Sequence, residues 1–463
     1  MRHLFLSILF IFTLNQFNTQ AQPSPANKTI QTANEELEFD RAVERYREEF
    51  SRLKGARAAV PRDDARVSQF KESLPRLSLS DIARIVGEDF PQDTAILFYD
   101  YDEDGHLRAW LIGKRGVEGF SQSNVGLEQI RSTVAGLRDA LDIERLQRAR
   151  KPQLRDLALS GKSIPAARPP INTDQAIANL TRLLLPEAIA AALTQVKNLI
   201  VVPVLDIGTV PFAILQPLGT KAMLIDSMSI SVAPSLFDIT LEKPAPWSSK
   251  FNSPLIVGNP RFTDKSKWTI PNLPGAEDEA KAIATALDAE PLIGPAATKE
   301  VVLQRVADAD LLYFATHAVG DSQNSRNNSF LVFGFTGNDL GFWTMAEILD
   351  AHQKWGVMSG PSKKTPLKAR LAILSACQTG VGEVWKGGVM SLGRTIQASG
   401  VPRVVMSLWN VSDSATVDLM RSYVSHLEKD IPAEALRKAM LDTRANHPSP
   451  AQWAAFVYFG LPF

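Results

Sequence analysis

Residues 371–380 read LAILSACQTG, an apolar run that ends in small and polar residues around Cys377, the only cysteine of the chain. A short run rich in branched residues, followed by a polar loop with Gly380 and Gly382, predicts a buried parallel strand that delivers Cys377 to the carboxyl edge of a sheet. Open α/β sheets bind their ligands at this edge. The stretch therefore predicts an α/β fold with a parallel sheet and a reactive thiol at its edge.

A second stretch, residues 311–318, reads LLYFATHA and repeats this pattern with the imidazole of His317 in the place of the thiol. His317 precedes Cys377 by 60 positions (377 − 317), a separation that fits the ends of two neighbouring strands joined by a crossover. Thiolate is the nucleophilic form of cysteine, and imidazole can take the proton. The pair is thus a candidate catalytic dyad. The alternative is two ordinary buried residues at the ends of core strands.

Residues 199–463 carry an ordered series of further motifs. The series comprises VP at 202–203, VPFA at 210–213, SISVAPSLF at 229–237, GNP at 258–260, LPGA at 273–276, FATH at 314–317, LSACQTG at 374–380, GG at 387–388, SL at 391–392, SLWNVSD at 407–413 and WAAF at 453–456. This series resembles the CHAT family of caspase-like (clan CD) cysteine peptidases, related to caspases and separase. The residues around Cys377 are also similar to the caspase signature, whose histidine stands about 50 residues upstream.

The resemblance implies a caspase-like fold of three layers, with a parallel sheet between two layers of helices. It divides the chain into a catalytic domain at 250–463 and a degenerate caspase-like lobe at 91–243, which contains no cysteine and so no thiol nucleophile. A short helical segment, residues 22–90, precedes both. The polar, Pro-containing stretch between 243 and 250 is the predicted linker.

Local patterns agree with alternating helices and strands. We expect helices near 35–53, 80–86, 125–146, 174–196, 277–287, 298–306, 343–349, 389–398 and 414–427, with Ser78 or Ser80 and Thr298 as N-caps. We expect strands at 94–101, 107–112, 199–204, 222–232, 254–258, 311–316, 371–376 and 403–408.

The turn between the first two strands is the one stretch that partly matches a calcium loop. Asp100, Asp102, Asp104 and Gly105 match its opening, but Leu111 stands where the bidentate glutamate would close it. A solvated hairpin turn is the better interpretation. The histidines show no paired spacing typical of zinc, so we expect no metal and no cofactor.

The N-terminus predicts export. A basic residue, an apolar run from Leu4 to Leu14 and the small-x-small sequence at 19–21 resemble a signal peptide of residues 1–21. The run is shorter than the roughly 20 residues that a spanning helix needs. The alternative is a buried first element. We therefore expect a periplasmic or secreted protein without stable membrane insertion after cleavage.

Composition narrows the possible partners. The formal net charge is zero, which gives no electrostatic footprint for nucleic acid. A single cysteine forbids an internal disulfide, and an unpaired thiol in an exported protein suggests either that its reactivity is used or that it is deeply buried. The expected partner is a protein or peptide substrate, and a protein activator remains an open option.

The chemistry implied by the dyad is acyl transfer. The Cys377 thiolate attacks a peptide carbonyl, and His317 protonates the leaving amine. Backbone N–H groups of Cys377 and of the segment at Ala318 and Gly320 are the expected oxyanion donors. Relatives carry His-Gly where this chain has Ala318, so the local backbone has less freedom and Gly320 is the substitute.

A preference for a basic residue before the scissile bond follows from the resemblance, because separase-like relatives prefer arginine there. Asp413 is the first candidate for the acidic counter-charge, with Glu383 and Asp321 as further candidates. Asp413 has an alternative role as N-cap of the helix that follows it.

Three functions fit the sequence. The first is an exported endopeptidase with the Cys377/His317 dyad. The second is a catalytically silent CHAT fold that serves as a binding or scaffolding module. The third is another acyl transfer, such as hydrolysis of a non-peptide amide or ester.

Overall fold

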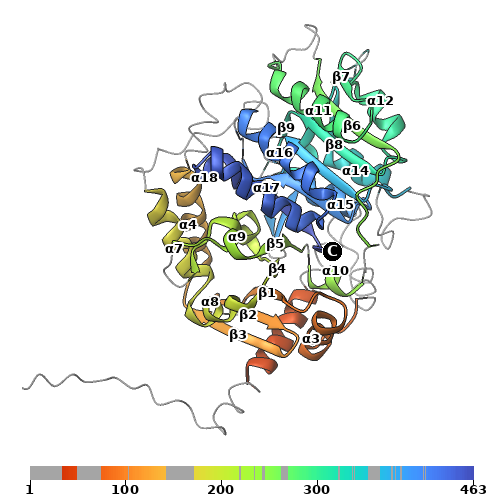
Figure 1. The fold of residues 1–463 in the computed structure, drawn as a ribbon. Coiled ribbons are helices and arrows are strands. Elements are labelled where there is room, and N and C mark those ends of the chain that lie inside the picture. Colours follow the sequence, from red (N-terminus) through yellow and green to blue (C-terminus); the bar gives the residue numbers. More distant parts are fainter. Residues whose placement is uncertain are drawn as a thin grey trace, which may run out of the picture.

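The fold is organised around one sheet of 11 strands, in the order β3-β2-β1-β4-β5-β16-β15-β12-β8-β6-β7 (Figure 1). The structure of the protein is a computed structural model. The residues that the structure describes are 34–48, 74–102, 104–141, 172–217, 221–233, 235–241, 246–261, 270–321, 324–335, 337, 339–352, 365–376, 379–380, 382–385, 388–409, 411 and 413–463. Strand pairs near the centre are mostly parallel, which confirms the predicted α/β class.

The half of the sheet that carries the motif stretches is parallel except at one pair. Its strands are β6 (Pro254–Pro260), β7 (Leu292–Gly294), β8 (Leu311–Thr316), β12 (Leu371–Ala376), β15 (Arg403–Ser407) and β16 (Phe456–Gly460). Only β16 runs antiparallel to its neighbour β15 within this half. The β8 strand is buried along its whole length, as expected for a strand covered on both faces.

Helices cover both faces of this half. On one face are α11 (Pro274–Ala286), α16 (Asp413–Leu427), α17 (Pro432–Asn446) and α18 (Pro450–Trp453), and on the other are α12 (Lys299–Arg305), α14 (Met345–His352) and α15 (Leu392–Ala398). Alternate residues of β8 enter two separate cores: Tyr313 packs with the α11 side and Phe314 with the α12 side. The helix–sheet–helix layering predicted for the chain is therefore present.

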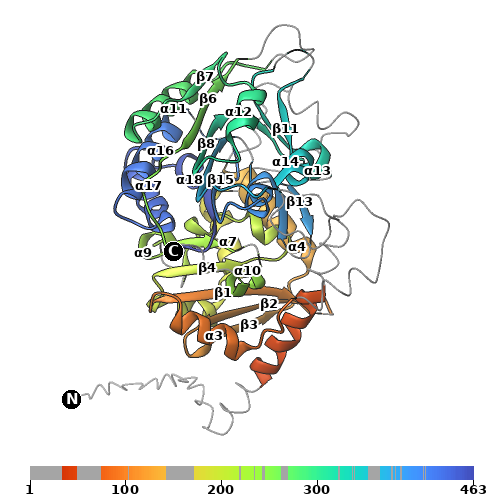
Figure 2. The same ribbon diagram turned by 90° about the vertical axis from the view of Figure 1, so that its right-hand side faces the viewer.

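The other half begins with an antiparallel meander and continues with parallel strands. The meander is β1 (Thr94–Tyr101), β2 (Leu107–Gly113) and β3 (Gly116–Ser123), and the parallel strands are β4 (Asn198–Val202) and β5 (Ser229–Val232). Figure 2 shows this half at the opposite end of the sheet from β6 and β7. The predicted hairpin of 94–101 and 107–112 is confirmed.

Helices also cover both faces of the meander half. One face carries α4 (Leu127–Ala140), α7 (Thr173–Leu184), α8 (Glu187–Ala192), α9 (Leu224–Ser227) and the short helices η1 (Leu193–Gln195), η2 (Leu205–Thr209) and η3 (Phe212–Ile214). The other face carries the helix of residues 34–48, α3 (Leu79–Glu88) and α10 (Leu236–Leu241). Phe39 from the 34–48 helix packs edge-on against Phe98 of β1, so the N-terminal helical segment belongs to the same core.

The two halves share the sheet. Parallel pairing of β5 with β16 joins Val232 to Phe459, so the sheet is continuous across the linker predicted between 243 and 250. The domain boundaries drawn from the sequence stay predictions.

Two small sheets lie outside the main one. The first contains β9 (Ala318–Val319), β10 (Phe330–Val332) and β11 (Phe342–Thr344), with α13 (Ser325–Asn328) in the connection. The second is the hairpin of β13 (Gly382–Trp385) and β14 (Gly388–Ser391). Both are formed by the chain directly after the sites of His317 and Cys377.

Several local predictions are wrong in part. The expected strand 222–232 begins with the helical turn of α9, because Asp226 accepts a hydrogen bond from the N–H of Met223 and closes the turn. The expected helix 389–398 starts only at Leu392, after β14. The expected helix 343–349 is preceded by β11, and β3 was not predicted.

Among the described residues, no single helix is long and apolar enough to cross a membrane. The pair Thr173–Leu184 and Glu187–Gln195 passes this test of length and composition together, but with a bend of 88°.

Candidate active site

The register of two neighbouring strands brings the two motif stretches to the same edge. Parallel pairing of β12 with β8 sets Ser375 beside Ala315 and Ala376 beside Thr316. The next residues in the chain are Cys377 and His317. The predicted nucleophile, Cys377, lies outside the described residues.

His317 is held by a carbonyl from a different part of the chain. Its Nε2 lies 2.7 Å from the backbone oxygen of Pro271, and the side chain is largely buried, with 8% of the residue exposed. A carbonyl oxygen only accepts, so this contact requires a proton on Nε2. In the neutral imidazole Nδ1 is then the basic nitrogen, which is the form that a proton acceptor needs.

The segment after His317 is fixed by strand pairing. The N–H of Val332 donates to the His317 carbonyl at 2.9 Å, and Ala318 and Val319 pair with Leu331 and Phe330. Hydrogen-bonded and non-bonded pairs alternate along an antiparallel ladder, so the N–H of Ala318 points away from β10. Gly320 follows at the end of β9 and is partly exposed.

Asp321 uses its carboxylate within its own loop. The residue is 5% exposed, and its two carboxylate oxygens accept from the N–H of Asn324 at 3.1 Å and from Nδ2 of Asn328 at 2.8 Å. Its own N–H donates to Ser329 Oγ. These bonds order the loop between β9 and β10.

The other acidic candidates are placed only by their backbone. Glu383 lies in β13, and Asp413 is the first residue of α16; the side chains of both lie outside the described part of the structure. The counter-charge and N-cap roles of Asp413 both stay predictions.

Thr379 and Gly380, shortly after Cys377, form hydrogen bonds with β15. The sequence did not predict these contacts. Thr379 is buried, and its Oγ1 accepts from the N–H of Ser407 at 2.9 Å. The N–H of Gly380 donates to the Ser407 carbonyl at 2.8 Å, and Ser407 Oγ donates to the Ala376 carbonyl. Ser407 therefore holds the chain on both sides of Cys377. A Cβ at Gly380 would lie 3.0 Å from Leu408 Cδ2 and 3.2 Å from the Ser407 carbonyl, closer than an ordinary van der Waals contact.

A buried ion–phenol pair lies on the α11 side of the His317 strand. Tyr313 of β8 donates its hydroxyl to Glu279 of α11 at 2.6 Å. Burial, with the Glu279 charge as a further cause, raises the pKa of Tyr313 well above its usual value, so the phenol stays protonated. The pair ties the strand that ends at His317 to the helix that follows Pro271.

The acidic hairpin turn forms internal ion pairs. Asp102, Asp104 and His106 lie close enough to hold an ion, but Asp102 already accepts from the His106 backbone and from Arg108. Leu111 is buried in β2, as the hairpin interpretation requires.

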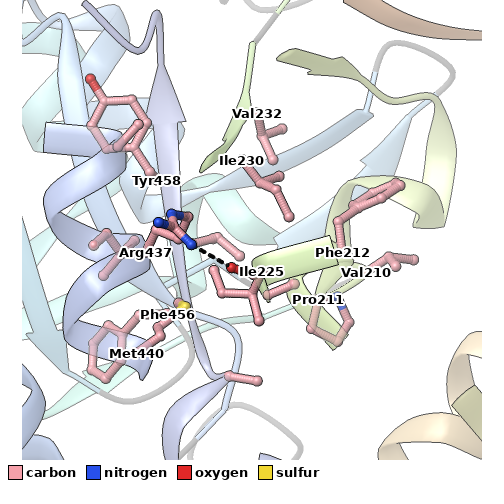
Figure 3. A pocket seen from close by; sticks show the side chains of 15 residues that line it. Val210, Pro211, Phe212, Ile225, Ile230, Val232, Arg437, Met440, Phe456 and Tyr458 are labelled. Carbon is pink, nitrogen blue, oxygen red and sulfur yellow. Dashed lines mark hydrogen bonds between the residues drawn. The ribbon is translucent and has the colours of Figure 1, made fainter. Parts of the chain in front are cut away.

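A separate small pocket lies between the two halves, where β5, β16 and α17 meet (Figure 3). The side chains that line it are apolar apart from Arg437 and Tyr458, and the Tyr458 hydroxyl donates to the Leu461 carbonyl at 2.7 Å. Arg437 donates to the Ile225 carbonyl at 3.0 Å and to Glu434 at 2.9 Å. The residues that line this pocket include neither imidazole nor thiol, so it is not the site predicted from the motifs.

The protein is thus a mixed α/β protein. Two of its parallel strands, β8 and β12, are followed in the chain by His317 and by the single cysteine. The family model of the CHAT domain matches residues 174–461, and the chain belongs to this family. The family match covers both halves of the sheet except the meander.

Two curated relatives are each named Tetratricopeptide repeat protein 28. The human protein is 25% identical over 306 residues, and the mouse protein is 24% identical over 302 residues. Each match covers 57% of this chain and 12% of the relative, so the chain spans about an eighth of their length.

Among solved structures, the chain is similar to that of the Saccharomyces cerevisiae separase–securin complex, with a TM-score of 0.47 and 13% identity over 86% of this chain and 31% of the other. It is also similar to the Arg-specific cysteine proteinase gingipain R, with a TM-score of 0.39 and 9% identity over 67% and 69%.

Proposed function

We propose that the protein is an exported cysteine endopeptidase that hydrolyses peptide bonds with a Cys377/His317 dyad. The observation that carries the proposal is the register of β12 on β8, which pairs the residues immediately before Cys377 and His317. The chain belongs to the CHAT family, and its motifs resemble those of the caspase-like cysteine peptidases of this family. Both points support the same chemistry.

The proposed reaction begins with the transfer of the thiol proton to His317. The contact with Pro271 keeps the Nε2 proton, so Nδ1 is the nitrogen that takes it. The Cys377 sulfur forms a bond to the peptide carbonyl carbon, and His317 gives the proton to the leaving amine. Water then attacks the acyl-enzyme with His317 as base, which releases the carboxylic acid and restores the thiol.

The oxyanion is proposed to bind backbone N–H groups at the same edge. The N–H of Ala318 is the donor that strand pairing leaves free to point away from β10. Gly320 and the backbone of Cys377 are the further donors predicted from the sequence.

The preference for a basic residue rests on the resemblance to separase-like peptidases. Asp413, the first residue of α16, and Glu383, in β13, are the proposed counter-charges. Asp321 has a competing role, because its carboxylate orders its own loop.

Export is proposed from the sequence of residues 1–21, which resembles a signal peptide. The compartment would be the periplasm or the exterior.

A second function, a silent scaffold, is favoured by one observation. The curated relatives are named as tetratricopeptide repeat proteins, and the match covers only a small part of each. Repeat proteins of this kind present extended binding surfaces.

The test is hydrolysis of fluorogenic peptides that end in Arg, Lys or Asp before the reporter, with a reducing agent and calcium present. We expect the wild type to cleave the Arg and Lys peptides and the Cys377→Ala variant to cleave none. Equal rates from the two proteins would refute the dyad. Cleavage of simple esters but no peptides would favour the third function, and silence towards all substrates would favour the scaffold.

A further inference from the structure

We propose that Asn259 is a positioning residue that sets the tautomer of His317 through the Pro271 carbonyl. The proposal rests on the proposed function for its catalytic meaning, but its structural content can be tested without any substrate.

Asn259 lies at the same sheet edge as His317. It belongs to β6, whose residue Gly258 pairs with Ala315 of β8, two positions before His317. Asn259 is 5% exposed and has a φ of 45°, in the left-handed region. Asparagine tolerates this region better than most residues other than glycine.

Both ends of the Asn259 amide are used. Its Oδ1 accepts from the N–H of Leu273 at 2.8 Å, and its Nδ2 donates to Glu277 Oε2 at 3.1 Å. Leu273 is the N-cap residue of α11, and Glu277 lies in the first turn. The side chain therefore fastens the start of α11 to the end of β6.

The fastened segment is the one that holds His317. Pro271 precedes Leu273 by two residues, and its carbonyl contacts His317 Nε2 at 2.7 Å. The helix α11 is also held to the strand that precedes His317, because Tyr313 of β8 donates its hydroxyl to Glu279 of α11. Without the Asn259 amide, the 271–273 segment loses a hydrogen bond two residues from the carbonyl that fixes the histidine.

The consequence is specific to one ring nitrogen. With the carbonyl in place, the proton stays on Nε2, and Nδ1 is the nitrogen that accepts the thiol proton in the proposed reaction. If the carbonyl moves away, the proton can occupy either nitrogen, and the tautomer with Nδ1–H cannot act as the base. Asn259 thus acts on the reaction without touching the substrate.

Two substitutions separate this role from a backbone requirement. Asn259→Gly removes the amide but accepts the left-handed backbone more easily than asparagine does. Asn259→Asp keeps an oxygen that can accept from Leu273, the bond next to Pro271, but replaces the donor to Glu277 by an acceptor. A positioning role predicts that Asp retains more function than Gly, whereas a backbone role predicts the reverse. The matched control is Asp288→Gly, an exposed position with a φ of 50° just beyond the other end of α11.

The first readout is nitrogen NMR of the protein labelled in its histidines, of which there are six. The His317 signals are identified by their loss in His317→Gln. In the neutral imidazole of His317 we expect only the Nε2–H tautomer in the wild type, in Asp288→Gly and, in the main, in Asn259→Asp, and a clear population of the Nδ1–H tautomer in Asn259→Gly. An unchanged tautomer in a folded Asn259→Gly overturns the inference, as does an equal change in Asp288→Gly.

The second readout is peptide hydrolysis by the same variants. We expect kcat of Asn259→Gly to fall by up to about 100-fold, the loss that a misplacement of about 1 Å can cause, with KM little changed. A loss confined to KM contradicts the proposal. If the wild type cleaves no peptide yet the tautomer shifts as stated, the proposed function fails and the positioning role stands. If the wild type cleaves peptides and Asn259→Gly is unaltered, the positioning role alone fails.

Discussion

The substitution Tyr313→Phe tests the pair that ties the histidine strand to α11. The hydroxyl of Tyr313 is fully buried and donates at 2.6 Å to Glu279, which is 2% exposed. Phenylalanine removes that donor and changes little else in the packing. The carboxylate is left with one hydrogen bond fewer in a site that water does not reach.

The expected cost can be scaled from the geometry of the bond. A hydrogen bond to a charged group contributes about 1.5–3 kcal/mol, against about 1 kcal/mol for a neutral one. The short distance and the burial of both partners place this bond in the charged range. We therefore expect Tyr313→Phe to lower the free energy of unfolding by about 1.5–3 kcal/mol.

Two other buried tyrosines supply matched controls. Tyr99 donates to the Leu184 carbonyl at 2.7 Å, a neutral bond, so Tyr99→Phe should cost about 1 kcal/mol. The Tyr423 hydroxyl is buried without a hydrogen-bond partner among the described residues, so Tyr423→Phe should be neutral or stabilising. The three substitutions delete the same atom from three environments.

The assay is urea unfolding followed by tryptophan fluorescence, compared between variants that have equal m values. We expect the free energy of unfolding to fall most in Tyr313→Phe, less in Tyr99→Phe and not at all in Tyr423→Phe. A loss at Tyr313 no larger than that at Tyr423 would refute the assigned role of the Glu279 contact.

Two further predictions concern the N-cap of α3 and the contact of β6 with α11. Ser78→Ala removes the cap and should cost about 1 kcal/mol at neutral pH. The Ser78 hydrogen bond is the main cause that lowers the pKa of Asp81, so its contribution is present above the unfolded pKa of about 3.9 and is lost as the pH falls through the folded value. The difference in unfolding free energy between wild type and Ser78→Ala should therefore shrink in acid, and a constant difference would contradict this. Gly258→Ala would set a Cβ 2.4 Å from that of Ala280, and should cost about 1–3 kcal/mol or more in urea unfolding; an unchanged midpoint would contradict the packing.

Local sequence patterns predicted the elements that depend on local chemistry. The strand 371–376 was predicted because an apolar run with branched residues ends at a polar loop. An N-cap was predicted at Ser78 or Ser80, and the structure has it at Ser78. The hairpin of 94–101 and 107–112 has a glycine-bearing turn between two apolar strands. In each case the decisive residues lie within a few positions of one another.

The parts that the sequence missed depend on contacts across the chain. The Pro271 carbonyl lies 46 residues from His317, and no side-chain pattern marks a backbone acceptor. The Ser407 anchor near Cys377 likewise joins positions 31 residues apart. Asn259 was marked in the sequence, as the centre of the GNP motif. Its contacts with Leu273 and Glu277 became visible only in the structure.

The sequence predicted that His317 and Cys377 follow two neighbouring strands, and the structure confirms the pairing of these strands. The pairing of Ala376 with Thr316 is the geometry that a dyad at 377 and 317 requires. The roles of Glu383 and Asp413 stay predictions, since their side chains lie outside the described residues.

The most direct test of the central claim is the pH dependence of Cys377 alkylation by iodoacetamide. Cys377 is the only cysteine, so the reaction reports on one thiol. We expect the wild type to react rapidly well below a pH of about 8.5, where an ordinary thiol is protonated, and His317→Gln to move the pH profile of the reaction up to that value. Identical profiles in the two folded proteins would contradict the dyad.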